Sequence, residues 1–336
     1  MHILCIIDGM GDEGFSFSRM PTLRQAAREG AWGLFDTVPR GMSPETLPCT
    51  LSLLGVPEEL IPRFGRGAAE ALGAGLCLEP EDLILRGSWV SLDRKGRVTG
   101  FARPPEKLPD GVFPLEGYRS LILLKGAAGD AAGLVVFPPH DAFGALWEEL
   151  SPRGEGVLPG LFASWREGDR ALIPWGASSG RLPEFSRPGT AVAAAGVVKG
   201  AARALGMKLI CPRGATGETD TDLFAKLAAA EQAEEAGESF CLLHVGGADE
   251  AAHRKDAREK AEFLRRVERE LLPGLFIPGR RVLLCADHGS SPDTGAHLST
   301  PQPFVLFGGA RRGNLGLLPG GRAISLLEEE IWPGLS

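Results

Sequence analysis

Three short apolar runs, each followed by metal-binding types of side chain, constrain the fold of this chain most strongly. The runs span His2–Ile7, Phe240–Val245 and Arg281–Ala286. Asp8 directly follows the first run, Asp249 follows the second after three small residues, and Asp287-His288 follow the third. Uninterrupted apolar runs of this length are typical of strands that are covered on both faces. The sequence therefore predicts a buried, mostly parallel sheet whose strands end in polar residues.

Helical patterns alternate with these apolar runs. They cover Thr22–Glu29, Asp222–Ala236 and Glu250–Leu272, where apolar residues recur at helical spacing. Another apolar run, Pro303–Phe307, is a further strand candidate. Alternation of strands and helices predicts an α/β fold with a doubly wound, mostly parallel sheet as its core.

The middle of the chain has a different pattern. Between about residue 86 and residue 165 the apolar runs are shorter, and proline and glycine are more frequent. Leu121–Leu124 and Gly133–Phe137 are strand candidates of a smaller sheet. We therefore expect an inserted α+β domain at 83–167 within a core formed by 1–82 and 168–336.

Composition excludes several classes of function. The chain has 336 residues and a net charge of −7, and it has no Lys/Arg stripe with interleaved aromatic residues, so a nucleic-acid partner is not expected. No apolar run approaches the roughly 20 residues that a membrane span requires. The six cysteines are scattered without a CxxC pair, and the N-terminus has no basic leader, which favours a cytoplasmic protein. The sequence leaves the oligomeric state open.

The polar residues after the apolar runs predict a metal site. In an open α/β sheet, the carboxyl ends of the strands form the edge at which ligands bind. Asp249 and His253 are four residues apart, which places them on one face of a helix, and His297 follows in the next loop. Each residue alone could be a helix cap, a turn residue or part of a solvated face. Together they form a candidate set for divalent ions such as Mn, Zn or Mg: Asp8, Asp249, His253, Asp287, His288 and His297.

These motifs resemble the archaeal-type cofactor-independent (2,3-bisphosphoglycerate-independent) phosphoglycerate mutases of the alkaline phosphatase superfamily. The resemblance covers about two-thirds of the chain and is most specific as a combination of motifs. The matching segments are Asp8–Asp12, Leu51–Gly55, Gly65–Gly75, Val198–Gly200, Gly206-Met207, Gly214–Lys226, His244-Val245, Asp249–His253, Asp287-His288 and His297.

The resemblance implies two metal ions and a phosphorylated hydroxyl. One ion is expected on Asp249, His253 and His297, and the other on Asp8, Asp287, His288 and the nucleophile. The serine nucleophile of the family aligns with Thr46, and Ser43 is the next candidate if the alignment shifts. A hydroxyl beside a metal ion has a lowered pKa and can attack phosphorus. The alternative is that Thr46 and Ser43 only cap a helix.

The resemblance also implies a small phosphorylated substrate, with 1–82 and 168–336 as the metal-binding core and 83–167 as the domain that caps the substrate. His140, Arg86 and Arg119 are the candidate substrate-binding residues, with solvated surface arginine as the alternative for the last two. Leu47 and Thr50 replace polar residues that the family usually carries after its nucleophile. Three functions follow: interconversion of 2- and 3-phosphoglycerate, hydrolysis of a phosphate mono- or diester by the same site, or metal binding without catalysis. Complete retention of the six candidate ligands argues against the third.

Overall fold

The computed structural model describes residues 1–131, 134–137, 142–154, 156 and 158–329, and it contains two compact units. The first unit joins residues 1–62 to the part of the chain that begins at Phe185, and the second is Arg63–Glu184. The bounds of the second unit differ from the expected 83–167 at both ends: helix α3 (Arg66–Gly73) packs on its sheet through Ala71, and residues 170–179 form a strand of that sheet.

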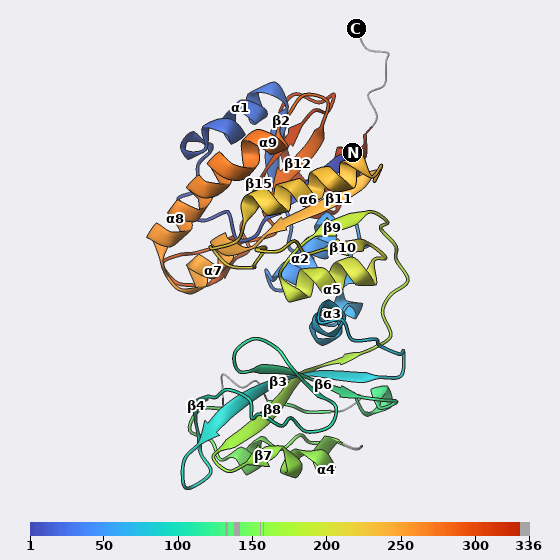
Figure 1. The fold of residues 1–336 in the computed structure, drawn as a ribbon, viewed down its shortest axis with the longest axis vertical. Coiled ribbons are helices and arrows are strands. Elements are labelled where there is room, and N and C mark those ends of the chain that lie inside the picture. The colour runs from blue at the N-terminus through green and yellow to red at the C-terminus, as the bar shows by residue number, and fades with distance from the viewer. Residues whose placement is uncertain (132–133, 138–141, 155, 157, 330–336) are drawn as a thin grey trace. The chain divides into compact units, whose positions relative to one another are not determined.

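The first unit is built on an eight-stranded sheet with the strand order β10-β9-β11-β1-β12-β15-β2-β16 (Figure 1). The strands are β1 (His2–Ile7), β2 (Ala31–Asp36), β9 (Thr190–Val192), β10 (Lys208–Ile210), β11 (Phe240–Val245), β12 (Arg281–Cys285), β15 (Gln302–Phe307) and β16 (Gly313–Pro319). β1 lies at the centre and pairs in parallel with β11 and β12, whereas β15 is antiparallel to both of its neighbours. All three apolar runs thus form strands, and the predicted mostly parallel α/β sheet is confirmed.

Helices cover both faces of this sheet. Alternate side chains of β1, β11 and β12 form one core with α1 (Pro21–Glu29), α6 (Leu223–Glu235), α8 (Ala257–Arg266) and α9 (Leu272–Leu275). The remaining side chains of these strands are buried on the opposite face, where α10 (Ala323–Glu328) contacts β1 and β12. Figure 1 shows α1, α8, α9 and α6 along the first face. Burial of each large aliphatic side chain contributes about 1.5–3 kcal/mol, so this double cover holds the strand ends in place.

The long helical pattern at Glu250–Leu272 is interrupted, which corrects the expectation of one continuous helix. α7 (Gly247–His253) ends just before Lys255, which has a positive φ of 57°. Asp256 then caps α8 by accepting a hydrogen bond from the backbone N–H of Glu259. The break separates α7 from the amphipathic α8.

No helix in the described part of the chain is long and apolar enough to cross a membrane.

The second unit has its own sheet and core. Its strand order is β5-β6-β3-β8-β7, and β4 pairs with β3. The strands are β3 (Leu83–Leu92), β4 (Val98–Phe101), β5 (Val112–Pro114), β6 (Arg119–Leu124), β7 (Arg166–Glu167) and β8 (Arg170–Ser179). The strand expected at Leu121–Leu124 is present as β6. The strand expected at Gly133–Phe137 is not: its described part, 134–137, has only a single bridge between Val135 and Arg153.

Candidate metal centre

The candidate ligands come from three segments that meet at the carboxyl ends of the central strands. Asp8 follows β1, Asp249 lies in the first turn of α7 after β11, and Asp287 follows β12. A short antiparallel ribbon then forms from β13 (Gly289–Ser290) and β14 (His297–Leu298), and the pairing of Ser290 with His297 returns the latter to the same edge. The structure therefore brings together all six residues that the sequence singled out.

The first group consists of Asp249, His253 and His297. The two carboxylate oxygens of Asp249 lie 3.2 Å from His253 Nε2 and 3.4 Å from His297 Nε2. The two imidazole Nε2 atoms are 3.0 Å apart. One carboxylate oxygen and two ring nitrogens thus surround one point, which is an arrangement that can hold a metal ion.

The second group surrounds Asp8. His288 Nε2 lies 3.3 Å from Asp8 Oδ1 and 3.7 Å from Asp287 Oδ2. Asp8 Oδ1 and Asp287 Oδ2 are buried and have no hydrogen-bond partner among the described residues. The other carboxylate oxygen of Asp8, Oδ2, lies 3.5 Å from His244 Nε2. Unsatisfied carboxylate oxygens are expensive to bury in an apolar interior, and a cation between them would satisfy them.

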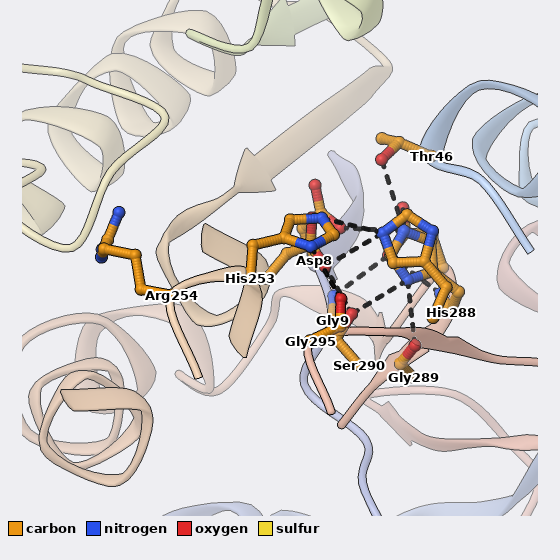
Figure 2. A network of polar contacts seen from close by, with 12 residues as sticks. Asp8, Gly9, Thr46, His253, Arg254, His288, Gly289, Ser290 and Gly295 are labelled. Atoms are coloured by element: carbon orange, nitrogen blue, oxygen red, sulfur yellow. Dashed lines mark hydrogen bonds and ion pairs between the residues drawn. The ribbon is translucent and has the colours of Figure 1, made fainter. Parts of the chain in front are cut away.

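The imidazole rings are oriented as metal ligands require. The other ring nitrogen of His253, Nδ1, lies 3.0 Å from the carbonyl oxygen of Gly295, and Nδ1 of His288 lies 3.2 Å from that of Gly289. A carbonyl oxygen can only accept, so each Nδ1 is the donor, and the proton that a metal ion displaces from either ring is the one on Nε2. Figure 2 shows His253, His288 and Asp8 gathered at this point. The residues present therefore fit divalent ions bound by oxygen and nitrogen.

Burial and neighbouring charges shift the pKa values of the candidate ligands. Burial raises the pKa of Asp8 well above its usual range, and the neighbouring Asp287 and Asp249 carboxylates add to this effect. Burial also raises the pKa of Asp287, despite the opposing effect of His288. For Asp249, burial is outweighed by hydrogen bonds from His253 and His297, which lower the pKa. The Asp249 hydrogen bond in turn raises the pKa of His253 to about 9.

Metal affinity is expected to rise with pH up to about 9. Below that value His253 carries a proton that a metal ion must displace, and the raised pKa values of Asp8 and Asp287 act in the same direction. In the metal-free protein, the raised pKa of His253 stabilises the fold fully below its unfolded value of 6.5, and this contribution disappears as pH rises through about 9. Calorimetric titration with Mn²⁺ in buffers of different ionisation enthalpy would measure the released protons. An affinity that does not change between about pH 6 and 9 would contradict the assignment.

Of the two candidate nucleophiles, Thr46 is the one beside the ligands. Its Oγ1 lies 3.3 Å from His288 Nε2 (Figure 2). Thr46 is the first residue of α2 (Thr46–Leu53), whereas Ser43 is exposed in the preceding loop. The alternative that either hydroxyl caps the helix is wrong, because the N-cap is Glu45 and no side chain caps this end.

Two buried residues to which the sequence analysis gave no role of their own lie at the centre: one contacts the ligands, and the other contacts His244. The hydroxyl of Ser290 donates to Asp249 Oδ1, and its Oγ lies 3.4 Å from His288 Nδ1. Lys226 donates from Nζ to the carbonyl oxygen of His244 at 2.8 Å, and burial lowers the pKa of Lys226 to about 8. His244 itself is buried, with its Nε2 3.5 Å from Asp8 Oδ2. The position of Ser290 directly after Asp-His-Gly was the available signal, but serine there is also an ordinary turn residue.

The candidate substrate residues belong to the second unit. Arg86 lies on β3, where its Nε donates to Glu70 at 2.9 Å and its guanidinium stacks 4.0 Å from the Trp175 ring. Arg119, at the start of β6, is exposed and lies 5.5 Å over the Tyr118 ring. His140 lies outside the described residues.

The family model and the two relatives that match this chain share one description. The model of the 2,3-bisphosphoglycerate-independent phosphoglycerate mutase family matches residues 27–104. A relative of that name from Methanoculleus marisnigri is 28% identical over 91% of this chain and 88% of its own length. The corresponding protein from Methanopyrus kandleri is 29% identical, over 91% of this chain and 87% of its own length.

Solved structures show the same fold. A protein from Pyrococcus horikoshii superposes with a TM-score of 0.73 at 21% identity, covering 98% of each chain. The cofactor-independent phosphoglycerate mutase from Thermoplasma acidophilum superposes with a TM-score of 0.58 at 17% identity, covering 97% of this chain and 99% of that one. The resemblance drawn from the sequence motifs is thus confirmed: over about nine-tenths of its length the chain is similar to proteins named as 2,3-bisphosphoglycerate-independent phosphoglycerate mutases.

Proposed function

We propose that this protein interconverts 2- and 3-phosphoglycerate by metal-dependent phosphoryl transfer through a phosphorylated Thr46. The observation that carries the proposal is the position of the Thr46 hydroxyl, 3.3 Å from His288 Nε2, the ring nitrogen that also lies 3.3 Å from Asp8 Oδ1. The names of the relatives supply the substrate class. Two divalent ions, Mn or Zn with Mg as the alternative, are expected on the two ligand groups.

The expected reaction has two transfers. The Thr46 oxygen forms a bond to phosphorus while the bond from phosphorus to the glycerate oxygen breaks, and the hydroxyl proton passes to the departing glycerate. The other hydroxyl of the reoriented glycerate then takes the phosphoryl group from Thr46 and gives up its proton. Divalent ions at the site would lower the pKa of the attacking hydroxyl and neutralise charge on the phosphoryl oxygens.

Retention of glycerate between the two transfers is the requirement that separates a mutase from a phosphatase. Arg86 and Arg119 are the proposed phosphate-binding residues of the second unit. Arg86 is held by Glu70 and Trp175, so its guanidinium is fixed in place before substrate arrives. Such preorganisation lowers the cost of positioning a substrate.

A second function, hydrolysis of a phosphate ester by the same site, is favoured by two replacements after the nucleophile. Leu47 and Thr50 stand where the family usually carries polar residues, and both are buried. Fewer polar contacts to the glycerate would allow water to take the phosphoryl group.

Incubation with 3-phosphoglycerate distinguishes these functions. We expect 2-phosphoglycerate to appear to equilibrium without release of inorganic phosphate, with Mn²⁺ or Zn²⁺ present, and no reaction in a chelator. Phosphorus NMR would follow both isomers and free phosphate in one sample. Stoichiometric phosphate release would select the hydrolase, and generic phosphate esters would then test its range of substrates.

A further inference from the structure

A buried ammonium group lies behind the candidate ligands. Lys260, on α8, has a side chain that is only 2% exposed. Its Nζ lies 2.6 Å from the carbonyl oxygen of Ser290, 3.0 Å from Asp12 Oδ2 and 3.4 Å from the carbonyl oxygen of Gly11. An ammonium group has three N–H donors, so these three acceptors match its full capacity.

The three acceptors and Lys260 itself belong to the segments that carry the candidate ligands. Gly11 and Asp12 follow Asp8 on the loop after β1, and Ser290 follows Asp287-His288 on the loop after β12. Lys260 lies on α8, which comes directly after the α7 helix of Asp249 and His253. One side chain thus joins all three segments.

The contact with Ser290 gives Lys260 a route to a ligand. The backbone N–H of Ser290 donates to the carbonyl oxygen of Gly11 at 2.9 Å, and its hydroxyl donates to Asp249 Oδ1. Lys260 holds the carbonyl oxygens of both Gly11 and Ser290. The backbone position of Ser290, and with it the direction of its hydroxyl, therefore depends on the ammonium group.

We propose that Lys260 is a positioning residue that acts through Ser290 to hold Asp249 in the orientation in which Asp249, His253 and His297 bind a metal ion. The proposal rests on the metal centre of the proposed function and adds a residue that is not itself a ligand. Groups that orient metal ligands typically contribute 10- to 100-fold to metal affinity. The cost of burying an ammonium group argues against an incidental role.

The test compares Lys260→Met, Ser290→Ala and the double variant in Mn²⁺ titrations without substrate. Lys260→Met keeps the apolar stem and removes the charge. We expect each single variant to weaken one of the two Mn²⁺ sites by about 10- to 100-fold. Because Lys260 acts through Ser290, the double variant should be no weaker than the weaker single variant, whereas independent effects would multiply.

Arg266→Met is the matched control. Arg266 lies on the same helix and also donates to backbone carbonyl oxygens, those of Thr219 at 2.6 Å and Thr221 at 3.0 Å, on a loop without candidate ligands. It should lower the melting temperature and leave Mn²⁺ affinity unchanged. A Lys260→Met protein that is destabilised in the same way but binds Mn²⁺ like the wild type would overturn the proposal.

Asp12→Asn covers the case in which Lys260→Met does not fold. It removes the charged partner of Lys260, keeps an acceptor oxygen, and changes a side chain that is 18% exposed. A smaller loss of affinity at the same Mn²⁺ site is expected, and unchanged affinity would count against the proposal. Since metal binding is measured without substrate, a failure to isomerise phosphoglycerate would contradict the proposed function and leave this result standing.

Discussion

Thr46→Ala is expected to lower phosphoryl transfer by about 10³-fold or more while both metal ions remain bound. The variant removes the hydroxyl that lies 3.3 Å from His288 Nε2. Loss of a covalent nucleophile lowers the rate by a factor on the order of 10³ to 10⁶. The three carboxylates and three imidazoles of the two groups remain in place. Rapid-quench measurement with labelled 3-phosphoglycerate would show turnover and the phosphoprotein, and metal analysis would show occupancy.

Ser43→Ala is the control for Thr46→Ala. Ser43 is exposed and lies three residues earlier in the chain, so its loss should leave turnover and the phosphoprotein unchanged. If Thr46→Ala turned over at the wild-type rate and Ser43→Ala did not, the nucleophile would be Ser43. Thr46→Ser should retain activity, because it keeps the hydroxyl at the start of α2.

Asp287→Asn is expected to abolish activity. Bound metal ions should raise the melting temperature of the wild type, and we expect this increase to be lost in the variant. Metal-ion catalysis contributes several kcal/mol, and each 1.4 kcal/mol is tenfold in rate, so we expect a loss of about 10³-fold or more. Asp287 Oδ1 accepts from the backbone N–H groups of Gly9 and His288, and asparagine can keep both contacts. Removal of one buried charge from a cluster of three carboxylates should leave the metal-free protein at least as stable as the wild type.

The matched control is Asp293→Asn, an exposed position in the same loop region. It makes the same chemical change without touching the ligand groups, so activity and metal binding should match the wild type. Calorimetry with and without Mn²⁺ would separate the two variants. Full occupancy of both metal sites in Asp287→Asn would remove Asp287 from the ligand set.

Much of the site follows from the sequence because two local rules combine. Buried strands are recognisable as apolar runs, and the residues that follow parallel strands share one edge of the sheet. These rules are enough to predict that Asp8, Asp249 and Asp287 lie close together. Asp249 and His253 are four residues apart, so helix geometry alone predicts that they lie on one face of a helix.

The tertiary structure decided the features that depend on packing between distant segments. Which of Thr46 and Ser43 lies beside the ligands depends on where α2 places its first turn. The contacts of Lys260 with Ser290 join α8 to a distant loop, and the assignment of α3 to the second unit depends on the sheet against which Ala71 packs. Local sequence sets periodicity and strand ends, because these follow from backbone geometry. Which buried side chain satisfies which distant polar group is a property of the whole fold, and only the folded chain specifies it.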